Sequence, residues 1–577
     1  MRNYTSLLLA ALFALGSAAR AADQSNHNAQ SHGAAHGGAH GGSHGAGHGS
    51  AAATAPPRAV LIDGLGDYHF AVTTSNPEAQ KFFNQGMVLI YGFNHDEGIR
   101  SFRRAAELDP KMAMAHWGIA LGLGPNYNID VDPAREKEAF EHVQKALALS
   151  KDGPAHERAF IEALSKRFSG DENPDLKKLA NDYAAAMRDL TKRYPDDLDA
   201  ATLFADAMMC LRPWQLYTKD HQPVEGTPEL VAALESVLKR DPDHIGANHL
   251  YIHAVEASAH PERALEAAAR LPVSAPAAGH LVHMPSHIYA RVGDHESSVT
   301  SNEAAVAADE KFFADLPDRK NGAYWVMYYP HNIHFIAYAQ GQSGNFAEAM
   351  KAADKLFAHS GPDVPAMPML EGFTAVRYGL LVRFNQFDQI LRSERPGDEK
   401  TFPLTSAMWH FARGVAQAER GDVAAAGSER DRLLAIKAQV PPDTIFGMLN
   451  KAHPVLEIAQ LTLDAKIAEV QRKHADAHQL LVRAIALEDD LIYSEPPDWL
   501  TPSREALGGM LLRQRKFAEA EKVFRDDLSR NPRGGRSLFG LMHSLKAQQK
   551  DHEAGLIERQ FKAAWKHADT ELRVEDL

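Results

Sequence analysis

Cysteine is almost absent from this chain: among 577 residues there is only Cys210. A single cysteine excludes a disulfide framework. No apolar run after the N-terminal segment reaches the length of a membrane-spanning helix, so we expect no membrane insertion. Basic residues are outnumbered, 62 against 75 acidic ones, and they form no stripe. Nucleic acid and anionic membranes are therefore not expected partners.

Several catalytic signatures are also missing from the sequence. It has no phosphate-binding glycine loop, no Gly-x-Ser-x-Gly elbow, no His-Glu-x-x-His and no Cys-x-x-Cys-His for haem. Serine or cysteine nucleophile chemistry therefore has no support. Alternating apolar and polar segments of useful length are absent too, which favours an all-α chain over one with a sheet.

The first residues have the pattern of a secretory signal. Arg2 supplies the positive charge, residues 7–15 form a short apolar run, and Ala19-Arg20-Ala21 is a small-x-small cleavage site. We therefore predict a signal peptide over residues 1–21 and a mature chain that begins near Ala22. The expected location is the periplasm of a bacterium, or outside the cell.

Residues 22–57 are a low-complexity stretch of Gly, Ala, Ser and His. A histidine stands at every fourth position of its centre, at His32, His36, His40, His44 and His48. The interleaved glycines disfavour a helix, so this stretch is predicted to be a disordered tether. Two interpretations remain open: loose capture of Zn, Cu or Ni by the imidazoles, and a solvated spacer.

From residue 58 to 577 the pattern is predominantly helical, and spaced small and aromatic residues recur within it. Gly86, Phe102, Ala105 and Pro110 form the clearest unit, and Gly508, Ala520, Phe524 and Pro532 a weaker copy. Gly293-Asp294, Gly344-Asn345 and Gly421-Asp422 have the composition of turns between two helices. These positions resemble the tetratricopeptide (TPR) repeat family, in which about 34 residues form two antiparallel helices.

The resemblance covers most of residues 76–566 and is clearest at 79–112, 245–357 and 501–566. It implies a TPR-like right-handed α-solenoid, because one helix pair cannot bury its own apolar face and neighbours must stack. In the family, the first helices of the repeats line the concave groove. These helices are therefore where ligand contacts are expected.

Histidine recurs in three successive segments of the predicted solenoid. The segments contribute His249 and His253, then His280, His283 and His287, then His331 and His334. Counting back from the turns at Gly293 and Gly344 gives His283 and His334 the same repeat position, and likewise His280 and His331. In the family these positions point into the groove. The sequence therefore predicts one groove-facing cluster that holds a divalent metal ion such as Zn, Cu or Fe.

Glu256 is the carboxylate nearest this face, one turn beyond His253. It is a candidate ligand, or a general base if the protein is an enzyme. The competing interpretation is that the histidines pack on Tyr251, Tyr289 or Tyr328. Pro285 leaves the relative orientation of these histidines open, because a proline inside a helix bends it. Such a bend would turn His280 and His283 away from His287.

Other residues are candidate groove contacts: Trp117, Tyr328 and Arg504. Trp117 fits either a ligand contact or the packing of the repeats. Tyr328 lies in an aromatic segment, residues 324–329, that can cover the histidines. Arg504 fits an anion contact, or an ion pair with a structural role.

Three functions remain open at this point. The first is an exported repeat scaffold that binds a metal ion in its groove, for metal handling or for binding a partner protein, a peptide or a small ligand. The second is a metal-dependent hydrolase or oxygenase that uses the same histidines. The third is a metal-free adaptor between proteins, the usual role of the repeat family. Only the first two require metal on the folded domain.

Overall fold

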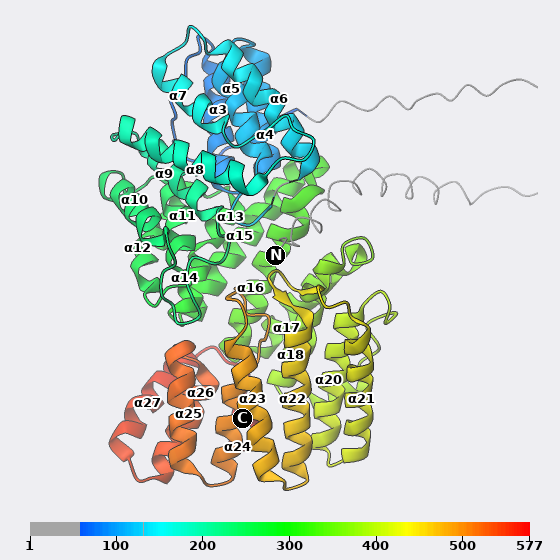
Figure 1. The fold of residues 1–577 in the computed structure, drawn as a ribbon. Coiled ribbons are helices and arrows are strands. Elements are labelled where there is room, and N and C mark those ends of the chain that lie inside the picture. Colours follow the sequence, from blue (N-terminus) through cyan, green and yellow to red (C-terminus); the bar gives the residue numbers. More distant parts are fainter. Residues whose placement is uncertain (1–57, 131) are drawn as a thin grey trace, which may run out of the picture.

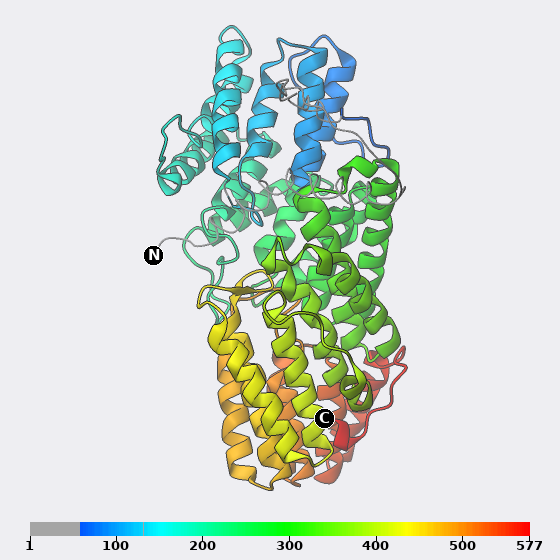
Figure 2. The ribbon, with the colours of Figure 1, turned by 90° about the vertical axis from the view of Figure 1, so that its right-hand side faces the viewer.

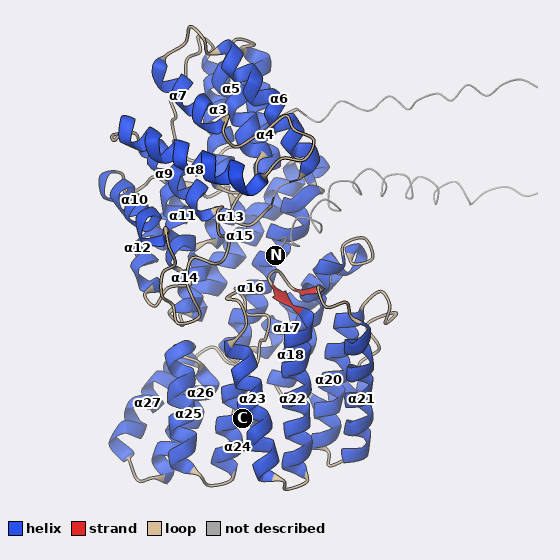
Figure 3. Ribbon diagram, in the orientation of Figure 1, coloured by secondary structure: helices blue, strands red, loops and turns tan. Residues whose placement is uncertain are grey.

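The computed structural model describes residues 58–577, except residue 131, so the predicted signal peptide and tether lie outside the described residues. Helices make up nearly all regular structure in the described part (Figures 1 and 3). The prediction of an all-α chain is confirmed. No helix in this part is long and apolar enough to cross a membrane.

Helices that follow one another in the chain pack together as pairs. The pairs at the N-terminal end are α3 (Pro77–Tyr91) with α4 (His95–Leu108), α5 (Ala113–Leu123) with α6 (Pro133–Leu149), α7 (Ala155–Leu164) with α8 (Leu176–Arg193), and α9 (Leu198–Met209) with α10 (Thr227–Arg240). The central pairs are α11 (Ile245–Val255) with α12 (Leu265–Ser274), α13 (Gly279–His283) and α14 (Pro285–Arg291) with α15 (His295–Asp315), and α16 (Tyr329–Gln342) with α17 (Phe346–Ser360).

The same arrangement continues to the C-terminal end of the solenoid. These pairs are α18 (Glu371–Arg383) with α19 (Phe387–Arg392), α20 (Pro403–Glu419) with α21 (Val423–Gln439), α22 (Ala452–Val470) with α23 (His474–Asp489), α24 (Ser503–Arg513) with α25 (Phe517–Arg530), and α26 (Gly535–Ala547) with α27 (Asp551–Ala564). The described helices thus form a TPR-like α-solenoid, as the sequence predicts (Figure 2).

Small residues allow the paired helices to approach each other. A Cβ added to Gly86 would lie 2.5 Å from the ring of Phe102, and one added to Gly508 would lie 2.6 Å from Phe524. Both distances are far below van der Waals contact, so a larger side chain would force the helices apart. The glycine and the phenylalanine of the sequence motif are therefore in direct contact between the two helices of a pair.

The turns within the pairs contain a residue in the left-handed conformation. Gly293, Gly344 and Gly421 have φ values of 73°, 79° and 80°, which glycine adopts without strain. The residue that follows each of them caps the next helix: for example, the Asp294 side chain accepts a hydrogen bond from the Ser297 amide. The predicted turns are confirmed at all three positions.

The C-terminal part of the solenoid contacts the central helices. The segment between α23 and α24 brings Glu495 within 3.1 Å of His287 on α14, and Asp490 reaches the loop between α9 and α10, where it forms an ion pair with Lys219 at 2.5 Å. The only strands among the described residues, β1 (Ile445–Phe446) and β2 (Asn450–Lys451), form a short antiparallel hairpin beside this segment. The inner face of the central repeats is thereby covered.

Candidate metal centre

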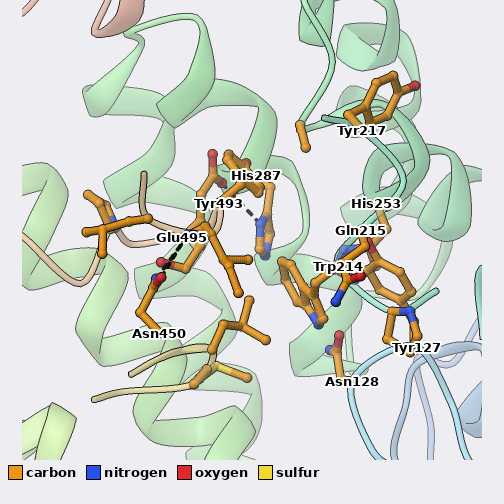
Figure 4. Close-up of a pocket in the computed structure, with 18 of the residues that line it drawn as sticks. Tyr127, Asn128, Trp214, Gln215, Tyr217, His253, His287, Asn450, Tyr493 and Glu495 are labelled. Carbon is orange, nitrogen blue, oxygen red and sulfur yellow. Dashed lines mark hydrogen bonds and ion pairs between the residues drawn. The ribbon is translucent and has the colours of Figure 1, made fainter. Parts of the chain in front are cut away.

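A cavity of about 2280 Å³ lies between the central repeats and the covering segment. Figure 4 shows Tyr127, Trp214 and His253 on one side of it, and Tyr493 and Glu495 on the other. The rings of Tyr127 and Trp214 stack at 5.2 Å. The cavity is large enough for an organic ligand or a peptide segment, and its walls are aromatic.

Six histidines gather at this cavity, all at most 8% exposed. They come from the first helices of three successive repeats: His249 and His253 from α11, His280, His283 and His287 from α13 and α14, and His331 from α16. Ring nitrogens of His249, His253 and His280 lie within 4.8 Å of one another, and so do those of His283, His287 and His331. We call these the first and the second histidine group.

In the first histidine group, hydrogen bonds fix the orientation of two rings. Nδ1 of His249 donates to the carbonyl oxygen of Tyr91, and Nδ1 of His253 donates to Glu256 Oε1 at 2.9 Å. Because both acceptors lack a proton, each Nε2 keeps its lone pair. Neither Nε2 has a hydrogen-bond partner among the described residues, nor does either ring nitrogen of His280. Buried nitrogens without a protein partner require an explanation, such as a bound ion or an ordered water.

The backbone of His280 is held by a separate network. Its amide donates to the hydroxyl of Tyr324 at 2.9 Å, and that hydroxyl donates to Asp309. Asn332 also donates to Asp309, at 2.9 Å. Tyr324 belongs to a π-helical turn, Tyr324–Tyr328, directly before α16. Such turns are frequent at functional sites, and this one also places the Tyr328 ring 4.8 Å from His280.

Phe93 completes the surroundings of the first histidine group. It occupies the turn after α3 with φ of 54°, the same left-handed position that glycine fills in other repeats. Its ring lies 4.4 Å from that of His249 and stacks on His280 at 5.4 Å. The repeat turn therefore places an apolar ring among the imidazoles.

In the second histidine group, the imidazoles contact one another. Nε2 of His283 lies 2.9 Å from Nε2 of His287, and the His331 ring lies 4.8 Å from that of His283. Nδ1 of His283 donates to Asn302 Oδ1 at 2.6 Å. The side-chain nitrogen of Asn302 donates to the carbonyl oxygen of Ser298, so it is the oxygen of Asn302 that faces His283. Nδ1 of His287 faces two carboxylates, Glu256 at 2.7 Å and Glu495 at 3.1 Å.

The charges of the two histidine groups differ. Burial disfavours a charged His287, yet Glu256 and Glu495 raise its pKa to about 10, so it is an imidazolium at neutral pH. Burial likewise disfavours an ionised Glu256, but His287 and His253 hold its pKa below the usual range. In the first group, burial lowers the pKa of His249 and of His280 well below the usual value, and their rings are neutral.

Glu256 joins the two histidine groups. It is 1% exposed, its Oε1 accepts from His253 in the first group, and its Oε2 pairs with His287 in the second. Both oxygens thus contact imidazole N–H groups. This arrangement is suited to orienting the rings, in the way that carboxylates hold metal-binding histidines.

The bend at Pro285 leaves the second histidine group together. Helices α13 and α14 meet at Met284, which keeps helical φ and ψ angles of −51° and −35°. His283 and His287 therefore remain one turn apart, with ring centres 4.9 Å from each other. The uncertainty that Pro285 introduced into the register is resolved.

His334 and Trp117 lie apart from the six histidines. Three residues along α16 rotate a side chain by about 300°, so His334 points to the side of His331 and faces Phe373 of the next repeat, with ring centres 5.7 Å apart. Trp117 is 1% exposed and packs in the core, 5.8 Å from Phe160, rather than at the cavity. The position of a residue in its repeat therefore does not determine which residues of the neighbouring repeat its side chain contacts.

Tyr328 and Arg504, the other candidate groove contacts, line the cavity. The guanidinium of Arg504 is engaged by two carboxylates, Asp489 at 2.7 Å and Asp526 at 2.5 Å. These contacts match the structural ion pair rather than an anion site.

Several residues of the site are not evident from the sequence. Glu495 and Phe93 reach the histidines from segments far away in the chain, and Asn302 and Asp309 approach from the second helix of a repeat. Asn302 is the exception, because it lies in the same helix pair as His283 and its sequence spacing could have indicated the contact. The other contacts depend on how the repeats stack.

Comparison with known proteins adds little to this picture. No protein-family model matches the chain, and no curated protein does. A human IFIT1 dimer with m7Gppp-AAAA is 15% identical over 85% of this chain and 91% of that one, with a TM-score of 0.30. Yeast Tom70 is 14% identical over 84% and 99%, with a TM-score of 0.31, and the APC/C hetero-tetramer Cut9-Hcn1 is 12% identical over 84% and 76%, with a TM-score of 0.28.

These values are too low to relate the proteins in function. The TPR-like architecture of this chain is shown by its own helix pairs, their glycine contacts and their left-handed turns.

Proposed function

We propose that this protein binds a divalent transition-metal ion through the first histidine group, His249, His253 and His280. One observation carries this proposal: Nε2 of His249, Nε2 of His253 and the ring nitrogens of His280 are buried and lack a partner among the described residues, while ring nitrogens of the three lie within 4.8 Å. Hydrogen bonds to Tyr91 and Glu256 already hold two of the rings.

The donor set indicates the class of ion. Neutral imidazoles suit Zn²⁺, Cu²⁺ or Fe²⁺. Three protein ligands leave a coordination position open for water or a ligand. Since His253 and His280 line the cavity, that position is reached from it. A small ligand or peptide held between the aromatic walls would then bind the ion directly.

The expected role is metal-dependent ligand binding after export of the protein. The predicted signal peptide favours export, and the histidine-rich sequence of the predicted tether favours local collection of the ion. A hydrolase or oxygenase is a weaker alternative, because both oxygens of Glu256 contact imidazole N–H groups and the side chain is 1% exposed. That geometry favours a positioning role for Glu256 over that of a general base.

The test is the metal content of the full chain with the six histidines of the tether changed to serine (His27, His32, His36, His40, His44 and His48). After loading with Zn²⁺ or Co²⁺ and removal of the excess, we expect tightly bound metal in this background. His249→Gln should lose the ion of the first group. His334→Gln is the matched control, because it is a half-buried histidine on the first helix of one of these repeats and lies outside both groups.

Two results would contradict the proposal. One is metal-free protein of unchanged thermal stability after loading, which would favour an adaptor between proteins. The other is equal metal loss in His249→Gln and His334→Gln, which would indicate a general effect of histidine removal on the fold. Circular dichroism of each variant checks that the helices are retained.

A further inference from the structure

We infer that the second histidine group, His283, His287 and His331, holds a second metal ion beside the first, so that the protein carries a two-metal centre. The second site does not depend on the first being occupied. Its ligands come from a different set of helices, α13, α14 and α16.

The geometry of the second group fits one ion. Ligand nitrogens around a tetrahedral zinc ion lie about 3.3 Å apart. Here Nε2 of His283 and Nε2 of His287 are 2.9 Å apart, and ring nitrogens, one from each of His283, His287 and His331, lie within 4.8 Å of one another. These separations bracket the spacing expected of ligands to one ion. His287 and His331 also line the cavity.

The partners of these rings are those of metal-binding histidines. Asn302 accepts from Nδ1 of His283, and Glu256 and Glu495 face Nδ1 of His287. Both Nδ1 atoms are therefore engaged on the side away from the group, and both Nε2 atoms point into it. Hydrogen bonds of this kind fix the ring orientation of histidine ligands.

The two groups are adjacent, yet no single ion can use all six rings. Rings from the two groups are neighbours: the ring centres of His253 and His287 are 5.4 Å apart, and those of His280 and His283 are 5.6 Å apart. The donor nitrogens, however, converge in two separate sets of three. Glu256 is shared, with one oxygen toward a ring of each set. The arrangement is that of two neighbouring ions whose ligands are oriented by one carboxylate.

A competing position for the second ion lies at Glu256, His287 and Glu495, whose donor atoms are also within 4.8 Å of one another. There the ion would replace the proton on Nδ1 of His287 and use carboxylate oxygens. We favour the histidine set because Nδ1 of His287 is already paired with both carboxylates, at 2.7 and 3.1 Å, and Nε2 of His283 faces Nε2 of His287 across the ligand position.

The experiment measures metal stoichiometry with Zn²⁺ in the full chain that lacks the tether histidines. We expect two ions per chain in this background, one in His249→Gln, one in His331→Gln and none in the double variant. His334→Gln should keep two. With Cu²⁺ the two-ion form should show magnetic coupling in its electron paramagnetic resonance spectrum, and each single variant should show an isolated ion.

The outcomes separate this inference from the proposed function. One ion that is lost in His249→Gln and kept in His331→Gln would overturn the second site and leave the first. One ion that is lost only in His331→Gln would support the second site and overturn the first. Loss of an ion in Glu495→Gln together with its retention in His331→Gln would place the second ion among the carboxylates and overturn the histidine set.

Discussion

The first histidine group, on α11 and α13, and the second, on α13, α14 and α16, lie side by side but are held in different ways. The first is neutral, and Nε2 of His249, Nε2 of His253 and both ring nitrogens of His280 lack a partner in the described part of the chain. The second contains an imidazolium, His287, balanced by Glu256 and Glu495. The same residue type is thus a neutral candidate ligand in one group and the charged partner of two carboxylates in the other.

This difference shows that burial and carboxylate contact decide what a histidine does. Burial alone favours neutral imidazole, which is ready to bind an ion. Two carboxylates at Nδ1 of one ring offset burial and keep that ring charged, so an ion that binds its Nε2 must displace the Nε2 proton. We therefore expect the first group to bind metal more readily, and the second to bind with release of a proton.

The largest effect that separates the groups is expected from loss of a ligand. His280→Gln should lower the affinity for the first ion by more than about 100-fold. This exceeds the 10- to 100-fold loss that is typical when a hydrogen-bonded partner of a ligand is removed. The second ion should be nearly unaffected, because His280 is not among the three ligands of that group. Competition with a coloured chelator measures both affinities. Equal weakening of both ions would show that the six histidines act as one site.

The second-largest difference between the two groups is expected in the pH dependence of their metal affinities. The pKa of His287 is raised to about 10, so below pH 10 the second ion must displace a proton, and its affinity should rise about tenfold per pH unit between pH 6 and 8. The pKa values of His249 and His280 are lowered well below 6.5, so the first ion should change little over this range.

These pH profiles are measured one site at a time. His331→Gln reports the first ion alone, and His249→Gln reports the second. A flat profile for the second ion would contradict the imidazolium at His287, and a steep one for the first would contradict the neutral state of its rings.

Glu256→Gln should weaken both ions, by about 10- to 100-fold each, because the carboxylate orients one ring of each group. Glu371→Gln is the control: this buried glutamate contacts Thr405 and no histidine of the site. Titration calorimetry of the two variants checks the prediction. A change confined to one ion would show that Glu256 serves a single group.

The smallest effect is expected from Asn302→Ala. It removes the acceptor of Nδ1 of His283 and should weaken only the second ion, by about tenfold. The first ion is the internal control, because none of its ligands contacts Asn302. Weakening of the first ion in this variant would indicate that the two groups are mechanically coupled.

The helix pairs were predictable from the sequence because their signals are local. Gly86 and Phe102 are sixteen residues apart and meet in one hairpin, and Gly293-Asp294 combines a left-handed turn with a helix cap. Backbone conformation and close packing within one repeat restrict the residue type at each such position. Spacing alone then reveals the repeat.

The histidine site was predictable only in part. Matching repeat positions placed His249, His253, His280, His283, His287 and His331 on the first helices of three successive repeats, and the structure brings these six together. The same reasoning included His334, which faces Phe373 instead. Spacing gives the side of a helix, but the angle between neighbouring helices decides which of two adjacent rings joins a cluster.

The amino-acid pattern is sufficient to predict the all-α repeat architecture, its turns and the concentration of imidazoles on consecutive first helices. The division of those imidazoles into two sets of three, and the charge on His287, follow only from the folded chain. Glu495 lies 208 residues after His287 and meets it only because the C-terminal repeats cover the central ones. Contacts within a hairpin leave a periodic pattern in the chain, whereas contacts between distant repeats depend on superhelical geometry and leave none.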